Sequence, residues 1–426
     1  MVAAVAPEPP PAAGRWLIVA AGLHFRGGMD KANAELASYL LERGAALDIV
    51  AHDVDAMFRA HPRVTLHLVP RPLGSFALGE FGLDRRGRSV AKHLRASDPA
   101  ARVIVNGGNC QVPDVNWVHY VHHAWTASPS DAPWWFHLKH RLFSARWRRM
   151  EKAAIRQARL VIANSEMTRT QLVAHVGASA ERVRTIYLGT DAGWGPVSPR
   201  ERASARAWLR LDGDRPAVAF VGALGRDRRK GFDTLWRAWT TLAAGQGWDV
   251  DLVVAGSGAD GAALSAAAGQ AGLADRVHVL GQTDRIKDVL AAVDLLVSPV
   301  RYEPYGLNVQ EALCRGIPAL VSRTAGVAER FPPELADLLL DDPDNSDDLV
   351  RRLSLWRANV DAWKIRVAPL GRELRSYGWR DMAAAFVGAV EGRTEGAGAV
   401  ACCGTDRGGA SARAGGPGGA KLPGGQ

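Results

Sequence analysis

The sequence predicts an α/β protein in which two domains of similar size each carry a parallel sheet covered by helices. Short apolar strands alternate with amphipathic helical stretches from Arg15 onward, a pattern typical of parallel sheets with helices on both faces. A glycine- and proline-rich stretch at 193–199 interrupts this alternation, and a second series of the same kind follows it. The chain has 426 residues, a length that is comfortable for two domains.

Each half of the chain has its own run of strands. The first strand, RWLIVA at 15–20, leads into a glycine-containing turn at 22–30 and then into a helix at 31–44 that ends at Gly44. The other strands of the first half are expected at 46–52, 63–69, 101–107, 115–122, 159–165 and 182–188. The second half is expected to contribute strands at 217–223, 249–256, 276–281, 295–299 and 318–322, and a helix at 379–392.

These patterns set the expected domain boundaries. The small, proline-rich start and the aperiodic, glycine-rich end are both expected to be disordered, and the start lacks the features of a signal peptide. The predicted division is a leader at 1–14, a first domain at 15–193, a second domain at 194–375, a C-terminal helix at 376–392 and a tail at 393–426.

Composition limits the class of protein and the kind of partner. Hydrophobic residues make up 47% and charged residues 23% of the chain, and no apolar run is long enough to span a membrane. The net charge of +9 favours anionic partners such as nucleotides and phosphates. Four cysteines at 110, 314, 402 and 403 have neither metal-site nor disulfide-framework spacing, so we expect a reduced, cytoplasmic protein.

The stretch RYEPYGLNVQEAL (301–313) places two glutamates eight positions apart. Pro304 biases Glu303 toward an extended conformation, so Glu303 is expected in a loop. The following helix is expected to begin near Gly306 and to end at Arg315, with Glu311 about one turn inside it. Free N–H groups at the start of this helix would then lie between the two carboxylates and could bind an anion or a hydroxyl group. The alternative is a capping carboxylate followed by an ordinary exposed glutamate.

This stretch resembles the signature of the retaining nucleotide-sugar glycosyltransferases of family 4 (group 1), in which two glutamates flank seven residues with a Gly-Leu pair between them. The resemblance extends, in the family's order, over roughly residues 15–386. It is carried by FRGGMDKANAELASYLLERG, LVIANSEMTRTQL, VRTIYLGTD, FVGALGRDRRKGFDTLWRAW, LVVAGSGADGAAL and RVHVLGQTDRIKDVLAAVDLLVSP. The resemblance implies the GT-B fold, two Rossmann-like domains facing a central cleft, with the last helix crossing back onto the first domain.

The resemblance also implies an activity. We expect transfer of a hexosyl unit from a UDP- or GDP-linked sugar, with retention of configuration and with neither an essential metal nor another cofactor. The acceptor would attack on the face that the diphosphate leaves, so no side-chain nucleophile is needed. The acceptor remains open between a glycan, a lipid-linked molecule and a small molecule, and it would enter from the first domain.

The residues expected to act on the leaving diphosphate lie in GRDRRKG (225–231). By resemblance, Lys230 is the diphosphate lysine and Glu303 holds the donor sugar. The family's arginine position holds Ala223 in this chain, so Arg226 is the first choice for the partner of Lys230 and Arg229 the alternative. The predicted catalytic residues are therefore Arg226, Lys230 and Glu303.

Other residues are expected to contact the substrates. By resemblance, Glu311 holds the ribose, the turn with Gly27 and Gly28 faces the diphosphate, and a histidine at a strand end contacts the donor sugar. His122 is preferred for that role and His119 is second. The expected substrate-binding residues are Gly27, Gly28, His119, His122, Arg229, Gly306, Leu307, Asn308 and Glu311.

Other interpretations compete with this one. A non-catalytic nucleotide-sugar-binding relative would keep the same fold. Gly256, Gly258 and Gly261 form a GxGxxG after a strand, which would suit an NAD-dependent oxidoreductase, but no acidic residue ends a strand about 20 positions later. The Asp-x-Asp at 53–55 is interpreted as a chance match to a metal-binding pair.

The stretch at 134–159 has eight Lys or Arg residues and one Glu, mixed with aromatic residues. Such a helix could pack its apolar side on the sheet, or it could rest on an anionic membrane as a peripheral contact. A nucleic-acid partner is not expected, because no recognition fold accompanies the charge.

Overall fold

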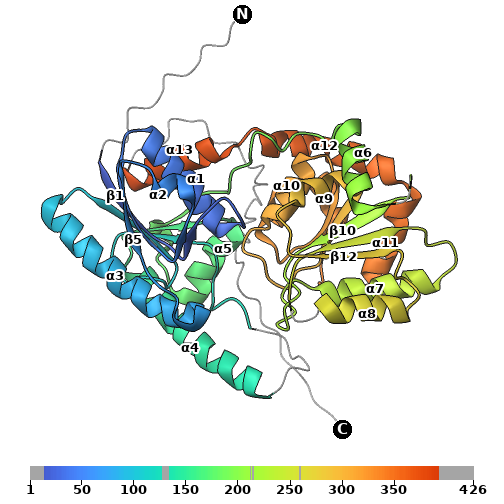
Figure 1. The fold of residues 1–426 in the computed structure, drawn as a ribbon, viewed down its shortest axis with the longest axis horizontal. Coiled ribbons are helices and arrows are strands. Elements are labelled where there is room, and N and C mark those ends of the chain that lie inside the picture. Colours follow the sequence, from blue (N-terminus) through green and yellow to red (C-terminus); the bar gives the residue numbers. More distant parts are fainter. Residues whose placement is uncertain (1–13, 127–133, 212, 214, 259–260, 393–426) are drawn as a thin grey trace, which may run out of the picture.

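The computed structural model describes residues 14–126, 134–211, 213, 215–258 and 261–392. The expected tail at 393–426, and all of the expected leader except Gly14, lie outside these residues. The described chain forms two α/β domains side by side, the first blue to green together with the red-orange last helix, and the second light green to orange in Figure 1. This arrangement confirms the predicted class of two parallel sheets.

All seven strands of the first sheet are parallel. Because both faces are covered by helices, the strands are nearly continuous runs of valine, leucine and isoleucine. In spatial order the strands are β5 (Val64–Leu68), β3 (Ala46–Ala51), β1 (Arg15–Val19), β6 (Arg102–Asn106), β7 (Val115–Val118), β8 (Leu160–Ala163) and β9 (Val183–Thr185). A small separate pair, which the sequence did not predict, joins β2 (Gly22–Leu23) to β4 (Asp53–Val54).

The second sheet has six parallel strands and the same winding. Its spatial order is β12 (Val277–Gly281), β11 (Asp251–Ala255), β10 (Ala217–Val221), β13 (Leu295–Ser298), β14 (Ala319–Ser322) and β15 (Leu339–Leu340). In both sheets the chain builds outward to one side of its first strand and then crosses to the other side. The two points of reversal lie between β1 and β6 and between β10 and β13, and ligands of such sheets bind beyond the strand ends at such points.

Thirteen α-helices surround the sheets in the described part of the chain. Those of the first domain are α1 (Met29–Glu42), α2 (Ala56–Arg59), α3 (Phe76–Ser97), α4 (Trp134–Gln157) and α5 (Glu166–Gln171). The rest are α6 (Pro199–Leu209), α7 (Phe232–Ala244), α8 (Gly261–Gln270), α9 (Ile286–Ala292), α10 (Leu307–Cys314), α11 (Ser346–Ala358), α12 (Val360–Arg375) and α13 (Trp379–Val390). Short 3₁₀ or π turns lie at Pro72–Gly74, Leu172–Val176, Ala180–Arg182, Gly326–Arg330 and Pro333–Leu338. No helix in these ranges combines the length and apolarity of a membrane span.

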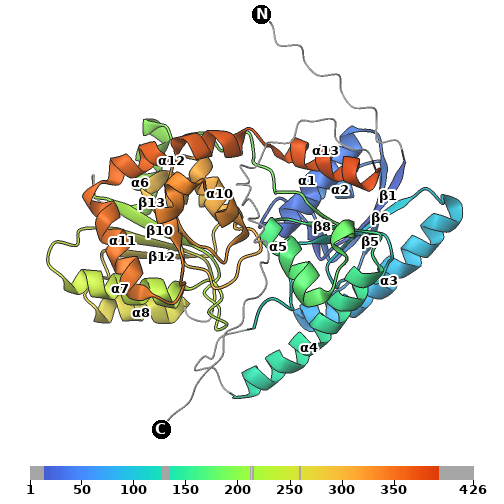
Figure 2. The ribbon, with the colours of Figure 1, turned by 180° about the vertical axis from the view of Figure 1, so that it is seen from behind.

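The chain passes twice between the domains. It leaves the first domain after β9 and returns before α13, and the two crossings touch at a single parallel bridge between Thr190 and Gly378. They lie so close that a Cβ on Gly189 would be 2.4 Å from the backbone nitrogen of Trp379. The last helix, α13, then packs on the first domain beside α1, as Figures 1 and 2 show, with Phe386 against Trp117 in the core.

Candidate active site

Two loops meet at the point of reversal in the second sheet. The first joins β10 to α7 and carries the cations of GRDRRKG, and the second joins β13 to α10 and carries Glu303. Two hydrogen bonds hold them together: the Arg301 backbone N–H donates to the Arg229 carbonyl at 2.9 Å, and the Arg229 side chain donates to the Tyr302 carbonyl at 3.2 Å. The two loops are therefore one unit, although they are about 70 residues apart in the chain.

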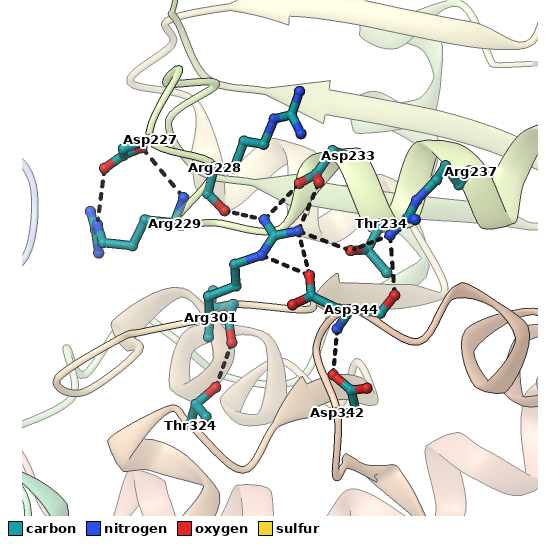
Figure 3. A network of polar contacts seen from close by, with 11 residues as sticks. Asp227, Arg228, Arg229, Asp233, Thr234, Arg237, Arg301, Thr324, Asp342 and Asp344 are labelled. Atoms are coloured by element: carbon teal, nitrogen blue, oxygen red, sulfur yellow. Dashed lines mark hydrogen bonds and ion pairs between the residues drawn. The ribbon is translucent and has the colours of Figure 1, made fainter. Parts of the chain in front are cut away.

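Arg301 fastens this unit, as Figure 3 shows. Its guanidinium is 8% exposed and binds both carboxylate oxygens of Asp233, at 2.7 Å each. The same group bonds Asp344 at 2.8 Å and donates to the carbonyl of Arg228. Bidentate pairs of this kind fix geometry as well as adding energy. No role was predicted for Arg301, because its partners lie in helix α7 and in other loops.

Lys230 and Glu303 form an ion pair at the centre of the unit. Arg229 lies 3.8 Å from the same Glu303 oxygen, and the three side chains are only 16–22% exposed. Arg226 is exposed and makes no hydrogen bond or ion pair within the described chain. The structure thus brings Lys230, Glu303 and the alternative arginine, Arg229, together and leaves the first choice outside the cluster.

The segment after Glu303 has the local structure that the sequence predicts. Glu303 pairs with Ala325 as an isolated bridge, so its backbone is extended. The helix α10 follows Gly306, which has a φ of +107° that favours glycine, and its last residue is capped by Arg315. Asn308 is partly used by the fold, since its amide donates to the carbonyl of Val221 at the end of β10.

Glu311 faces the first domain across the interface rather than solvent. It lines a small cavity together with Lys31, Asp191, Leu307 and Trp379. Burial raises the pKa of Glu311 to about 8, with Lys31 opposing the shift and Asp191 adding to it. The alternative of an ordinary exposed glutamate is therefore wrong for Glu311, and Glu303 is also largely buried.

Glu311→Gln is expected to flatten the dependence of stability on pH. Because the folded state keeps a proton that the unfolded state releases, the free energy of unfolding falls as the pH rises from 4.5 to about 8. Glutamine removes this contribution, although Glu35, whose pKa burial raises to about 7, still acts in the same direction. Urea unfolding across this pH range measures the effect, with the exposed Glu334→Gln as control. If the free energy of unfolding depended on pH in the same way in wild type and Glu311→Gln, that result would contradict this expectation.

The two candidate histidines lie in different surroundings. The strand β7 ends at Val118, earlier than the sequence predicted, so His119 follows the strand directly and His122 lies in the loop. His119 packs against Trp117 and its buried Nε2 has no partner in the described chain, whereas His122 stacks on Trp147. Burial lowers the pKa of His119 to about 3 and that of His122 to about 4, so both are neutral at physiological pH.

The glycine turn of the first domain lies at the start of α1. Gly27 has a φ of +76°, and a Cβ on Gly27 or Gly28 would meet nothing within 4 Å, so the turn is open to an approaching group. Beside it, His24 lies 3.4 Å from Asp30, and one buried polar atom of each has no partner in the described residues. This pair was not among the predicted site residues.

A cavity of about 260 Å³ adjoins Lys230 in the second domain. Ala223, which stands at the family's arginine position, lines it together with Phe232, Trp236 and Leu264. The glycines of the GxGxxG pattern serve close packing beside it. A Cβ on Gly256 would lie 1.8 Å from the carbonyl oxygen of Gly222.

The Asp-x-Asp pair has local roles in the structure. Asp55 caps the N-terminus of α2, where its side chain accepts the N–H of Met57. Asp53 lies 3.4 Å from Arg59. Within the described ranges, no group of three or more His, Cys, Asp or Glu residues is arranged to hold a metal ion.

The chain matches two family models that follow one another. The model described as "Glycosyltransferase Family 4" matches residues 26–194, and "Glycosyl transferases group 1" matches residues 201–362. The boundary between them falls close to the crossing between the domains.

Two curated relatives match over about half of this chain. An alpha-D-kanosaminyltransferase from Streptomyces kanamyceticus is 29% identical over 249 residues, which cover 54% of this chain and 62% of the relative. A D-inositol 3-phosphate glycosyltransferase from Mycobacterium sp. (strain KMS) is 32% identical over 204 residues, covering 46% of this chain and 44% of the relative. The chain thus spans about half of the length of these relatives.

Solved structures share the fold over nearly the whole described chain. WaaG, a glycosyltransferase involved in lipopolysaccharide biosynthesis, superposes with a TM-score of 0.71 at 17% identity, covering 89% of this chain and 100% of its own. Anabaena HepE in complex with UDP and glucose has a TM-score of 0.67 at 18% identity, covering 88% and 99%. Both matched family models and the two-domain architecture show that the chain belongs to the GT-B glycosyltransferases of family 4, group 1.

Proposed function

We propose that this protein transfers a hexosyl unit from a UDP- or GDP-linked sugar to a hydroxyl-bearing acceptor, with retention of configuration and without a metal. The observation that carries the proposal is the cluster of Lys230, Arg229 and Glu303 at the reversal point of the second sheet. Two cations there can meet the charge that grows on a leaving diphosphate, and preorganised charges of this kind are the main means of lowering such barriers.

In this mechanism the donor separates the Lys230–Glu303 ion pair. The diphosphate binds Lys230 and Arg229. The N–H groups of Gly306, Leu307 and Asn308 at the start of α10 lie beside these two cations. Glu303 is then free to accept hydrogen bonds from the donor sugar, and Glu311 from the ribose. The ion pair keeps both charges satisfied, so neither Lys230 nor Glu303 is an unpaired buried charge.

The acceptor is proposed to bind at the strand ends of the first domain, by the open turn at Gly27 and Gly28. The partly exposed side chains of His24 and Asp30 beside this turn supply polar groups that suit an acceptor rich in hydroxyl groups. Relatives named for D-inositol 3-phosphate and for 2-deoxystreptamine make small cyclitols the first acceptors to test, before glycans and lipid-linked molecules.

Thermal shift followed by turnover tests the function. A donor present at 100 times its Kd is expected to stabilise the protein by about 2.7 kcal/mol. UDP-glucose comes first because HepE is seen with UDP and glucose, and GDP-mannose and NAD⁺ follow. Transfer is measured as release of the nucleoside diphosphate in EDTA, with myo-inositol or 2-deoxystreptamine as acceptor. The anomeric NMR signals of the product report whether the configuration is retained.

The outcomes separate the candidate functions. Transfer with retention supports the proposal, and inversion would overturn the retaining mechanism. Binding of UDP or GDP without any transfer would favour the non-catalytic relative, whereas binding of NAD⁺ alone would favour an oxidoreductase.

We also propose that the first half of α4 rests on an anionic membrane surface. This half projects beyond the first domain in Figures 1 and 2 and exposes Leu138 and Leu142, at 50% and 66%. Arg141 and Arg149 are exposed on the same helix, and Phe81 of α3, 60% exposed, lies beneath the guanidinium of Arg146. Exposed apolar groups flanked by cations suit an interface with acidic lipids.

Arg141→Glu is expected to weaken binding to phosphatidylglycerol vesicles by about 30-fold, because the lost basic residue contributes about 1 kcal/mol near such a surface and the new negative charge is repelled by about as much. Arg146 and Arg148 are unsuitable for this test, since they bond Glu80 and the backbone at His122. Co-sedimentation measures the effect, and Arg200→Glu, an equal reversal at an exposed site on α6, is the control. Equal binding by both variants would remove the membrane proposal.

A further inference from the structure

The loop after β7 is held by a carboxylate that the proposed mechanism does not use. We name residues 119–126 the histidine loop. Glu151, in the second half of α4, is completely buried, and its carboxylate accepts the backbone N–H groups of His122 at 2.8 Å and His123 at 3.2 Å. The ring Nδ1 of His123 lies 2.6 Å from the same carboxylate. Three groups of the loop thus converge on one side chain.

Arg148, one turn earlier on α4, binds hydrogen-bond acceptors of the same loop, whereas Glu151 binds its donors. Its guanidinium donates to the carbonyl oxygens of His122 and Trp125, each at 2.9 Å, and to the hydroxyl of Thr126 at 3.0 Å. His122 therefore has its N–H bound by Glu151 and its carbonyl bound by Arg148. This arrangement fixes the peptide planes on both sides of His122, and with them the direction of its side chain.

The other side of the histidine loop is held by the second domain. The Tyr302 hydroxyl accepts the N–H of Val121 at 3.0 Å and donates to Gln171 at 3.2 Å. Its ring stacks on Trp125 with a centroid distance of 6.1 Å and an angle of 8°. Tyr302 directly precedes Glu303, so the histidine loop lies between α4 and the segment that carries the donor-binding carboxylate.

A buried carboxylate at this position is not required for packing the helix. Burial raises the pKa of Glu151, and the hydrogen bonds from His122 and His123 oppose that shift. An apolar side chain would avoid the cost of burying the acid, but it would leave two backbone N–H groups of the loop unpaired. The carboxylate is therefore explained by what it does for the loop.

We infer that Glu151 is a positioning residue of the transfer reaction, which fixes the histidine loop against Tyr302 and thereby holds the segment that carries Glu303. This inference rests on the proposed function. Glu151 touches neither substrate in it and acts through the histidine loop. A displacement of about 1 Å in a group that positions the substrate is enough to lower the reaction rate by about 100-fold.

The test compares Glu151→Gln and Glu151→Asp with Asp114→Asn. Glutamine keeps the shape of Glu151 but turns an amide toward one of the donors, whereas aspartate keeps both acceptor oxygens. Asp114 is the matched control, a buried carboxylate of the same domain that accepts the N–H of Val103 and bonds Arg95. It lies before β7, away from the histidine loop. The readouts are donor kcat/KM, Kd for UDP or GDP, and hydrogen exchange of residues 119–126 in the full chain.

Glu151→Gln is expected to lower donor kcat/KM by about 100-fold and to leave the Kd of the nucleoside diphosphate within about twofold of the wild-type value. Exchange at the histidine loop should speed up by about tenfold or more. Glu151→Asp should recover part of both losses, and Asp114→Asn should lose thermal stability without either change. Unchanged exchange in Glu151→Gln, or a kinetic loss shared by Asp114→Asn, would overturn the inference. Absence of transfer by the wild type would instead overturn the proposed function, and the exchange comparison would still decide whether Glu151 holds the loop.

Discussion

Replacing Lys230 with alanine is expected to lower kcat/KM for the donor by about 10²–10³-fold, the loss typical of removing one preorganised group that stabilises developing charge. The ammonium group lies at the centre of the cation cluster and faces Glu303. Without it, the leaving diphosphate meets only Arg229 and the N–H groups of α10. Initial rates at varied donor concentration measure the loss, and Lys92→Ala, at an exposed site on α3, is the control.

The same assay decides which arginine assists Lys230. Arg229→Ala is expected to lower kcat/KM more than Arg226→Ala, because Arg229 lies 3.8 Å from Glu303 and Arg226 is exposed. The reverse order would restore the sequence-based assignment of Arg226. Wild-type kcat/KM in Lys230→Ala would show that the cluster does not stabilise the leaving group.

Local signals in the sequence were sufficient for α10 and for the loop before it. Pro304 restricts the residue in front of it, Gly306 permits the positive φ at the start of the helix, and Gly316 permits another after its end. These effects act between chain neighbours, so the sequence carries them directly. The same holds for the apolar runs of the strands, since a parallel sheet covered on both faces requires them.

The choice between Arg226 and Arg229 was not predictable in this way. The four cations between Arg226 and Lys230 look equivalent in the sequence, but two tight turns fold the loop, from Gly225 to Arg228 and from Arg228 to Gly231. Arg228 has a φ of +52° at the junction, which a residue other than glycine seldom adopts. This turn directs Arg229 and Lys230 to the same carboxylate, and it depends on Arg301, which arrives from another loop.

Long-range partners also explain why no role was predicted for Glu151 and why the surroundings of Glu311 were not predicted. Glu151 meets His122 across 29 residues, and Glu311 faces Lys31 of the other domain. A helical pattern shows that a carboxylate is on a given face, but it does not show what the face meets. The relative placement of the elements decides whether such a group is solvated, paired or buried.

Gly231→Ala is expected to be the most damaging small substitution in the second domain. Gly231 has a φ of +69°, and a Cβ there would lie 1.7 Å from the carbonyl oxygen of Pro299, which is a clash with backbone. To relieve it, the loop that carries Lys230 must move away from the loop that carries Glu303. We expect a loss of at least about 2 kcal/mol in the free energy of unfolding, together with a large fall in kcat/KM.

Gly272→Ala separates the clash from the backbone strain. Gly272 has the same φ of +69°, but a Cβ there meets nothing within 4 Å, so only the cost of the left-handed conformation remains, about 1 kcal/mol. Chemical denaturation measures both variants, and donor turnover at a temperature where both are folded measures the site. Since only the Gly231 side chain would push the two loops apart, its variant should lose both stability and turnover, whereas Gly272→Ala should keep its turnover. Equal costs for the two alanines would mean that contact between the loops does not hold Lys230 in place.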